Sequence, residues 1–180
     1  MNKKEINELL NLSYESVNSN LKFAETKNTF LVTFNSAIIG IIVAFLTGEK
    51  QISFIPKAFI VTFTLLILFA TLISVFSFVP LNKIGKILIA NCDSQKPKFM
   101  FYLYNASEFK VNDKERYKKF EKALKKNCNY DDDLSFLEKE LIFQIVDLSN
   151  IAFAKFKLFS YAVYVELIAT ILFGVFLILA

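Results

Sequence analysis

Histidine and tryptophan are absent from the 180 residues, and cysteine, proline and glycine are scarce. Without histidine, there is no imidazole for acid–base catalysis, for a Ser-His pair or for a zinc-His site. The two cysteines, Cys92 and Cys128, are too few for a cysteine-rich metal site or a disulfide framework. The four glycines are scattered, so no glycine-rich phosphate loop is present. These absences argue against an enzyme, and we expect neither catalytic residues nor a metal site.

Charge is missing from three long stretches of the chain. Hydrophobic residues make up 54% of the sequence, whereas a soluble domain has about 45–50%. Residues 28–48 and 58–82 contain no charge, and Glu166 is the only charged residue in 158–180. A helix that crosses a bilayer needs about 20 apolar residues. The sequence therefore predicts an all-α membrane protein with three transmembrane helices, at 29–47, 58–79 and 158–180.

The polar segments divide the rest of the chain. Residues 1–28 have apolar side chains at helical spacing, which indicates a cytosolic amphipathic helix. Because no glycine or proline interrupts residues 1–39, this helix is expected to continue into the first span. Residues 48–57 are a short external turn. Pro80, which lacks the amide proton that a helix needs, is expected to end the second span.

Residues 80–157 are expected to form a cytosolic helical module built from long helices that extend out of the bilayer. Asn112 and Asp113 can cap a helix that runs to about Leu124. Ser135 and Glu138 fit the Ser-x-x-Glu capping box. They are expected to begin one long helix, within residues 134–180, that becomes the third span.

The distribution of lysine and arginine predicts the topology. Of the 21 cationic residues, 19 lie in residues 1–28 and 81–157, and only two lie in the turn at 48–57. By the positive-inside rule, the N-terminus and the insert are cytoplasmic. The turn and the C-terminus are then outside.

Two polar residues stand out inside the predicted spans. Glu166 and Asn35 each need a partner in the bilayer, which makes them candidates for pore lining or gating. Glu166 also fits a shallow position near the headgroups, without such a role. The small-residue spacing of Ser36, Gly40 and Ala44 fits helix packing within one chain, and it also fits contact between copies in a homo-oligomer.

The insert at 81–133 combines aromatic residues with a modest positive charge. Arg116 is the only arginine in the chain, and its guanidinium suits a phosphate. The aromatic rings fit either the stacking of a base or a small core under a solvated surface. The acidic run at 131–133 would repel a nucleic acid. One small phosphate is more compatible than a polymer.

Four regions of the chain resemble a known family: residues 23–28 with Asn35 beyond them, Pro80, residues 99–109 followed by a helix with Tyr117, and residues 144–151 with Lys155–Phe156. Over nearly its whole length, the chain resembles the transmembrane effector family of Pycsar anti-phage systems. Glu25 and Asn28 stand where that family tends to have Asp and Ala.

The resemblance implies a function. Such effectors bind a cyclic pyrimidine nucleotide, cyclic CMP or cyclic UMP, which a partner nucleotide cyclase makes during infection. They then disrupt the inner membrane, and the infected cell dies. We expect no cofactor beyond this ligand, and a homo-oligomer in the bilayer.

The expected ligand contacts are assigned to the phosphate, to the face of the base and to the edges of the base, and one further pair is left open. Arg116 and Lys155 are assigned to the phosphate, Tyr102 and Tyr117 to base stacking, and Asn105 and Gln144 to the base edges. Glu25 and Lys27, at the entrance to the membrane, are either ligand contacts or a structural pair. The alternative function is a membrane scaffold that anchors a soluble partner and binds no small molecule.

Overall fold

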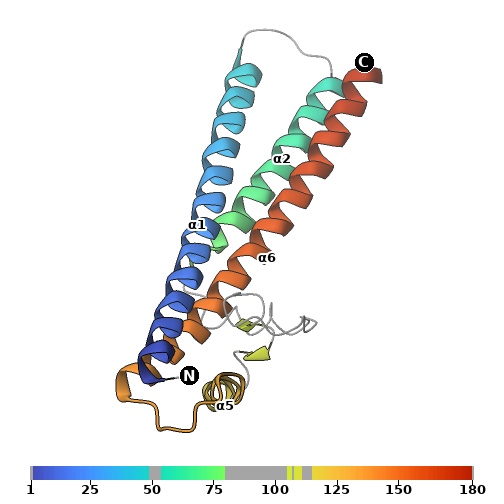
Figure 1. Ribbon diagram of the computed structural model, residues 1–180. Helices are drawn as coiled ribbons and strands as arrows, with labels where there is room; N and C mark the ends of the chain where they lie inside the picture. Colours follow the sequence, from blue (N-terminus) through green and yellow to red (C-terminus); the bar gives the residue numbers. More distant parts are fainter. Residues whose placement is uncertain (1, 49–53, 80–104, 107, 111–114, 180) are drawn as a thin grey trace. The chain divides into compact units, whose positions relative to one another are not determined.

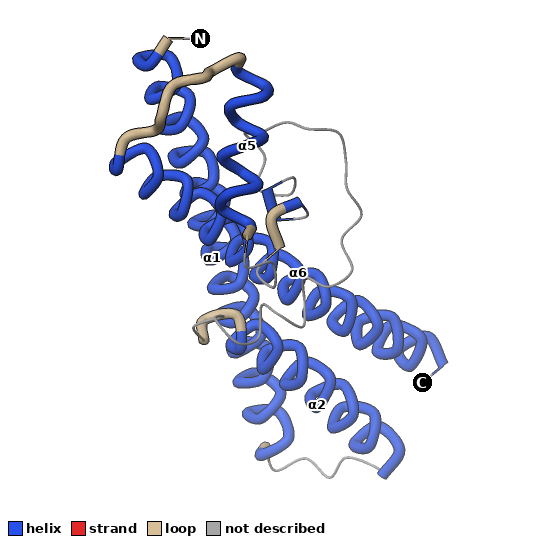
Figure 2. Tube along the Cα trace, turned by 90° about the horizontal axis from the view of Figure 1, so that it is seen from below, coloured by secondary structure: helices blue, strands red, loops and turns tan. Residues whose placement is uncertain are grey.

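The computed structural model describes residues 2–48, 54–79, 105–106, 108–110 and 115–179. Most of them form four helices: α1 Lys3–Thr47, α2 Phe54–Phe76, α5 Arg116–Cys128 and α6 Phe136–Leu179 (Figure 1). The described part of the chain contains no strand (Figure 2). The chain divides into two compact units, Met1–Ala24 with Pro80–Phe156, and Glu25–Val79 with Lys157–Ala180.

Helix α1 begins with a reciprocal cap that sequence reasoning missed. The amide of Asn2 donates to Oε2 of Glu5 at 2.8 Å, and the amide of Glu5 donates to Oδ1 of Asn2 at 2.9 Å. From this cap the helix runs 45 residues without a break, a length of about 68 Å at 1.5 Å per residue. The predicted continuation of the amphipathic segment into the first span is therefore confirmed.

Helix α6 begins at the capping box that the sequence predicts. The amide of Ser135 donates to Oε2 of Glu138 at 2.6 Å, and the Ser135 hydroxyl donates to the same oxygen at 2.8 Å. The amide of Glu138 lies 3.4 Å from Oγ of Ser135. The helix then continues for 44 residues, which agrees with the single long helix expected from the lack of proline.

Two helix ends differ from the sequence prediction. Helix α2 ends at Phe76 rather than at Val79, because the next three amides bond to carbonyls three residues earlier, as in Ser77 to Ser74 at 3.1 Å. Helix α5 passes Leu124 and ends at Cys128, where Asn129 adopts a left-handed conformation with φ 46°. Asparagine tolerates that conformation, so it closes the helix as glycine often does. The predicted cap at 112–113 lies outside the described residues.

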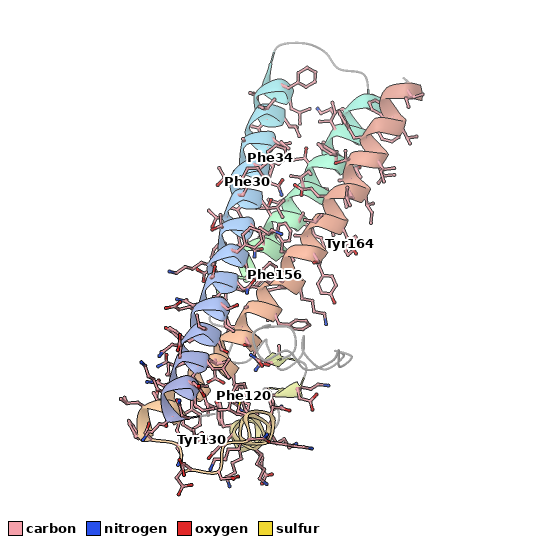
Figure 3. All side chains as sticks on the ribbon, in the orientation of Figure 1. Phe30, Phe34, Phe120, Tyr130, Phe156 and Tyr164 are labelled. Carbon is pink, nitrogen blue, oxygen red and sulfur yellow. The ribbon has the colours of Figure 1, made fainter. Side chains whose placement is uncertain are left out.

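The core of the first unit joins α1, α5 and α6. Apolar residues from one face of α1 pack with the aromatic rings of Phe109 and Phe120, whose centroids are 5.1 Å apart. Figure 3 labels Phe120 together with Tyr130, another buried member of this core. Removing large buried side chains such as these from water contributes about 1.5–3 kcal/mol each. The core therefore holds α5 against α6, which positions the site described below.

The second unit contains the apolar parts of the long helices. The described residues include three helices long and apolar enough to cross a membrane, at Lys3–Thr47, Lys57–Phe76 and Phe136–Phe176. Phe59 stacks on Phe176 at 4.5 Å between ring centroids, and Phe63 on Phe173 at 4.7 Å. Helices α2 and α6 are thus antiparallel. Phe30, Phe34 and Tyr164 point outward from the helices (Figure 3), as expected for side chains that face lipid.

Candidate functional site

Arg116, Tyr117 and Asp147 form a polar cluster in the first unit. Arg116 and Tyr117 are the first residues of α5, and Asp147 lies on α6. The guanidinium Nη2 is 3.3 Å from Oδ1 of Asp147. The Tyr117 hydroxyl lies 2.9 and 3.0 Å from the two oxygens of the same carboxylate, and Arg116 also donates to this hydroxyl. The only arginine of the chain is therefore held by a carboxylate and a phenol.

Two aromatic contacts fix the position of the Tyr117 ring in this cluster. The ring of Tyr117 meets the ring of Phe143 edge to face, with centroids 4.4 Å apart. The guanidinium carbon of Arg116 lies 4.3 Å from the centroid of the Tyr117 ring, which is a favourable cation–π distance. Because Phe143 and Asp147 are four residues apart on α6, they lie on one face of that helix. Tyr117 therefore spans both of them.

The electrostatics of the cluster keep the Tyr117 phenol neutral. Burial raises the pKa of the Tyr117 phenol, and its hydrogen bond to Asp147 raises this pKa further. The side chain of Asp147 is 49% exposed, whereas that of Arg116 is 19% exposed. The carboxylate is therefore the more exposed edge of the pair, and an incoming anion reaches Arg116 only when Asp147 moves aside. A phosphate oxygen is an equivalent acceptor for the guanidinium and for the phenol.

Asn150 adds a second polar contact between α6 and the segment that precedes α5. Its side-chain amide donates to the carbonyl of Phe109 at 3.1 Å and to that of Val146 at 2.7 Å. The amide of Phe109 donates to the carbonyl of Asn105 at 2.9 Å. Asn105 is fully buried, so its predicted contact with a base edge requires this segment to move.

The remaining predicted contacts are dispersed. Lys155 is buried on α6, whereas Gln144 is exposed and lines a different feature, a groove of about 840 Å³ between the first turns of α1 and α6. Arg116 and Tyr117 do not line that groove. Of the predicted ligand residues, Arg116 and Tyr117 are thus in direct contact with each other. Tyr102 lies outside the described residues.

Glu25 and Lys27 belong to the second unit. The ammonium group of Lys27 lies 5.3 Å from the centroid of the Phe159 ring, a cation–π contact in which its charge is stabilised. The backbone carbonyl of Glu25 accepts a hydrogen bond from the Thr29 hydroxyl at 3.0 Å. These contacts fit the structural role that the sequence left open for the pair.

In the same unit, Asn35 and Glu166 are neighbours across α1 and α6. Asn35 is 0% exposed, and Glu166 is half-buried. The two residues singled out from the sequence as intramembrane polar groups thus face each other in the interior of the helices. A role of Glu166 in pore lining or gating and a shallow position near the headgroups both remain compatible with this contact.

Sequence reasoning missed Asp147 and Asn150 as parts of the site. One signal was available, because a single arginine in a folded module needs a carboxylate partner. The spacing of Phe143, Asp147 and Asn150 also places them on one side of a helix. The fold was needed to choose Asp147 among the 17 acidic residues.

Among the described residues, no three His, Cys, Asp or Glu side chains are grouped so that they could hold a metal ion. Residues 9–180 match the family PycTM, the Pycsar effector protein domain. No curated protein and no solved structure matches the chain. The match includes α2, α5, α6 and nearly all of α1, so it spans both units. The chain therefore belongs to the Pycsar effector protein domain family, whose members act in anti-phage defence.

Proposed function

We propose that this protein is a membrane effector that binds a cyclic pyrimidine nucleotide, cyclic CMP or cyclic UMP, and then permeabilises the bacterial inner membrane. The nucleotide comes from a pyrimidine nucleotide cyclase, and the outcome is abortive infection. The protein catalyses no reaction in this scheme. Membership of the Pycsar effector family supports a role in anti-phage defence. We infer a ligand with a phosphate group from the Arg116–Tyr117–Asp147 cluster.

Phosphate binding at this cluster is an exchange of anions. A cyclic monophosphate carries one negative charge, as Asp147 does, so it can take the place of the carboxylate beside Arg116 without a change in net charge there. Tyr117 is protonated at neutral pH, since an ordinary tyrosine pKa is about 10, and it donates to the new oxygen. Asp147 is released when this happens. The cluster thus contains a phosphate site together with an internal anion that occupies it at rest.

Release of Asp147 links ligand binding to the membrane. Asp147 and Glu166 are parts of the same uninterrupted helix, α6. Because a ligand shifts an equilibrium only by its difference in affinity between two states, the nucleotide must bind better when α5 and α6 are rearranged. The loss of the Arg116–Asp147 contact supplies that difference.

The small-residue faces of the spans support self-association. A side chain added at Gly40 would meet no atom within 4 Å, and Ser36 and Ala44 are exposed. By contrast, Ala70 and Ser74 are buried inside the unit. The face on α1 is therefore open for close contact with a helix of another copy in the bilayer. We place the N-terminus in the cytoplasm, in agreement with the distribution of lysines.

Calorimetry with the purified protein in detergent tests the ligand. Cyclic CMP or cyclic UMP is expected to bind better than cyclic AMP or cyclic GMP. Arg116→Ala is expected to weaken binding by about 2–5 kcal/mol, the usual loss when one partner of a buried charged contact is removed. Lys118→Ala, an exposed change on α5, is the matched control. Equal or absent binding of all four nucleotides would refute the sensor.

The alternative function is a scaffold that anchors a soluble partner. One observation favours it: Phe136 and Leu137, at the start of α6, are 80% and 73% exposed, and Leu137 lines the groove of about 840 Å³. Exposed apolar side chains beside a groove are typical of protein-binding surfaces. A thermal-shift screen separates the two functions, because only a nucleotide that binds the folded protein raises its melting temperature.

A further inference from the structure

A cavity of about 470 Å³ lies in the second unit, between α1, α2 and α6. Four residues of α1, two of α2 and two of α6 line it, and all of them are isoleucine or phenylalanine. The wall on α1 includes Ile38 and Ile42, and the opposite wall includes Phe63 and Phe173. Every lining residue belongs to the second unit and to a helix long and apolar enough to cross a membrane. The cavity is therefore bounded by apolar side chains within the predicted spans.

The cavity exists because α1 packs on the other two helices at one end only. Leu31 of α1 is buried together with Ala70 of α2 and Ala162 of α6. In residues 36–47 of α1, all of which the structure describes, no residue is buried. The aromatic stacking between α2 and α6 keeps those two helices together over the same stretch, and α1 stands apart from them at this end (Figure 1). The packing of α1 is thus incomplete where the cavity lies.

Neither water nor empty space suits this cavity. A buried water molecule needs about 2–4 polar partners, and the side chains that line the cavity are apolar. An apolar cavity of about 150 Å³ already stays dry and binds benzene, and this cavity is about three times as large. An empty space would deprive the surrounding side chains of van der Waals contacts. The cavity therefore favours an apolar occupant.

The shape of the cavity favours a slender occupant over a helix of a second copy. One turn of a helix, about 10–12 Å across and about 5.4 Å high, would already take up a volume of this size. Helices approach each other closely in a bilayer where they carry small residues. On α1 a small residue, Gly40, lies almost opposite Ile38 and Ile42, because two residues correspond to about 200° of rotation. A lipid tail is as apolar as leucine, is narrower than a helix and surrounds the protein in the membrane.

We propose that this cavity binds one acyl chain of a membrane phospholipid, which fills the space between residues 38–45 of α1 and the α2–α6 pair. The chain contacts isoleucine and phenylalanine side chains of all three helices. It completes the packing of α1 that the protein's own side chains leave open. The small-residue face of α1 remains available to another copy. The inference goes beyond the proposed function, because binding of this lipid requires no nucleotide.

Native mass spectrometry of the full-length protein tests the lipid site. The protein is purified in detergent and mixed with palmitoyl-oleoyl phosphatidylethanolamine, and the wild type is expected to keep one phospholipid per chain. Ile42→Trp fills the cavity with an indole and should lose most of this lipid. Val43→Trp, at an exposed position outside the cavity, is the matched control and should keep it. Equal retention by the two variants would overturn the site. A wild type without lipid would also overturn it, and a lipid-free dimer would make a second copy the occupant.

Thermal unfolding separates a filled cavity from a damaged protein. The same phospholipid binds the folded state and is expected to raise the melting temperature of the wild type by a few degrees. Ile42→Trp should melt at least as high as the wild type without lipid, because its own side chain fills the space, and should gain nothing from lipid. Ile38→Phe, a smaller filling of the same wall, carries the test where the tryptophan variant does not fold. A gain in Ile38→Phe equal to that of the wild type would overturn the site. Failure to bind any cyclic nucleotide would refute the proposed function and leave the lipid site standing.

Discussion

Asn150 on α6 donates its side-chain amide to the carbonyl of Phe109 at 3.1 Å, across 41 residues of sequence. Phe109 in turn meets Phe120 of α5, with ring centroids 5.1 Å apart. One buried amide thus connects three segments of the first unit. Its second bond, to the carbonyl of Val146 at 2.7 Å, fixes its orientation on α6.

Asn150→Ala is expected to destabilise the first unit. The substitution leaves the buried carbonyl of Phe109 without this donor, and a lost buried hydrogen bond costs about 1–3 kcal/mol. Thermal unfolding in detergent measures the effect. Gln144→Ala, on an exposed part of the same helix, is the control and should melt as the wild type does. An unchanged melting temperature in Asn150→Ala would show that the contact has no structural role.

Asp147→Asn is expected to strengthen the binding of a cyclic nucleotide. The change removes the internal anion that competes with phosphate for Arg116. A partly exposed ion pair is worth about 0.2–1 kcal/mol, so the gain is a few-fold in Kd. Arg116→Ala changes affinity in the opposite direction, and calorimetry compares the two. Weaker binding in Asp147→Asn would mean that Asp147 contacts the ligand rather than competing with it.

Tyr117 is expected to lose its proton at a higher pH than an ordinary tyrosine does. Burial and the bond to Asp147 raise its pKa above 10.0 in the folded protein. The stability from this contact is therefore fully present below pH 10 and is lost as the pH rises through the higher, folded value. Phenolate absorbance is followed against pH in the wild type and in Tyr117→Phe. The late-titrating component should shrink in the variant without vanishing, because burial also raises the pKa of Tyr130. Identical titration curves would contradict the assignment.

Labelling of single cysteines checks the topology. In intact cells, a membrane-impermeant thiol reagent should label Gln51→Cys, but should label Cys92 and Cys128 only after permeabilisation. The expectation follows from the 19 of 21 cations assigned to the inside. Burial raises the pKa of the Cys128 thiol, so the labelling of permeabilised cells is done at alkaline pH. Labelling of Cys92 in intact cells would show that the predicted orientation is wrong.

Much of the fold follows from local chemistry that a sequence displays. The lack of charge predicts the three spans, and the Ser135–Glu138 spacing predicts the start of α6. The end of α5 at Asn129 was missed, because the conformation of a single asparagine is not evident before the fold is known. The end of α2 was placed three residues late, because the position of proline does not reveal that the three amides after Phe76 bond to carbonyls three residues earlier.

The site was predictable only in part. Arg116 stands out because it is the only arginine, but its partner Asp147 lies 31 residues away. Their contact depends on how α5 packs on α6, which helical periodicity alone does not determine. The packing of Leu31, Ala70 and Ala162 into one buried cluster was hidden for the same reason. Each helix presents a small or apolar residue there, and only their packing produces a cluster.

The bond between Tyr117 and Asp147 also has an optical consequence. The chain has no tryptophan, so its fluorescence comes from tyrosine when it is excited at wavelengths that phenylalanine does not absorb. A carboxylate that accepts a hydrogen bond from a phenol quenches the emission of that phenol, and Tyr117 lies 2.9 Å from its carboxylate. Displacement of Asp147 by a ligand would make Tyr117 brighter. Under the proposed function, Tyr117 is thus an intrinsic fluorescent reporter of ligand binding, which can be read without a label, in membranes and in real time.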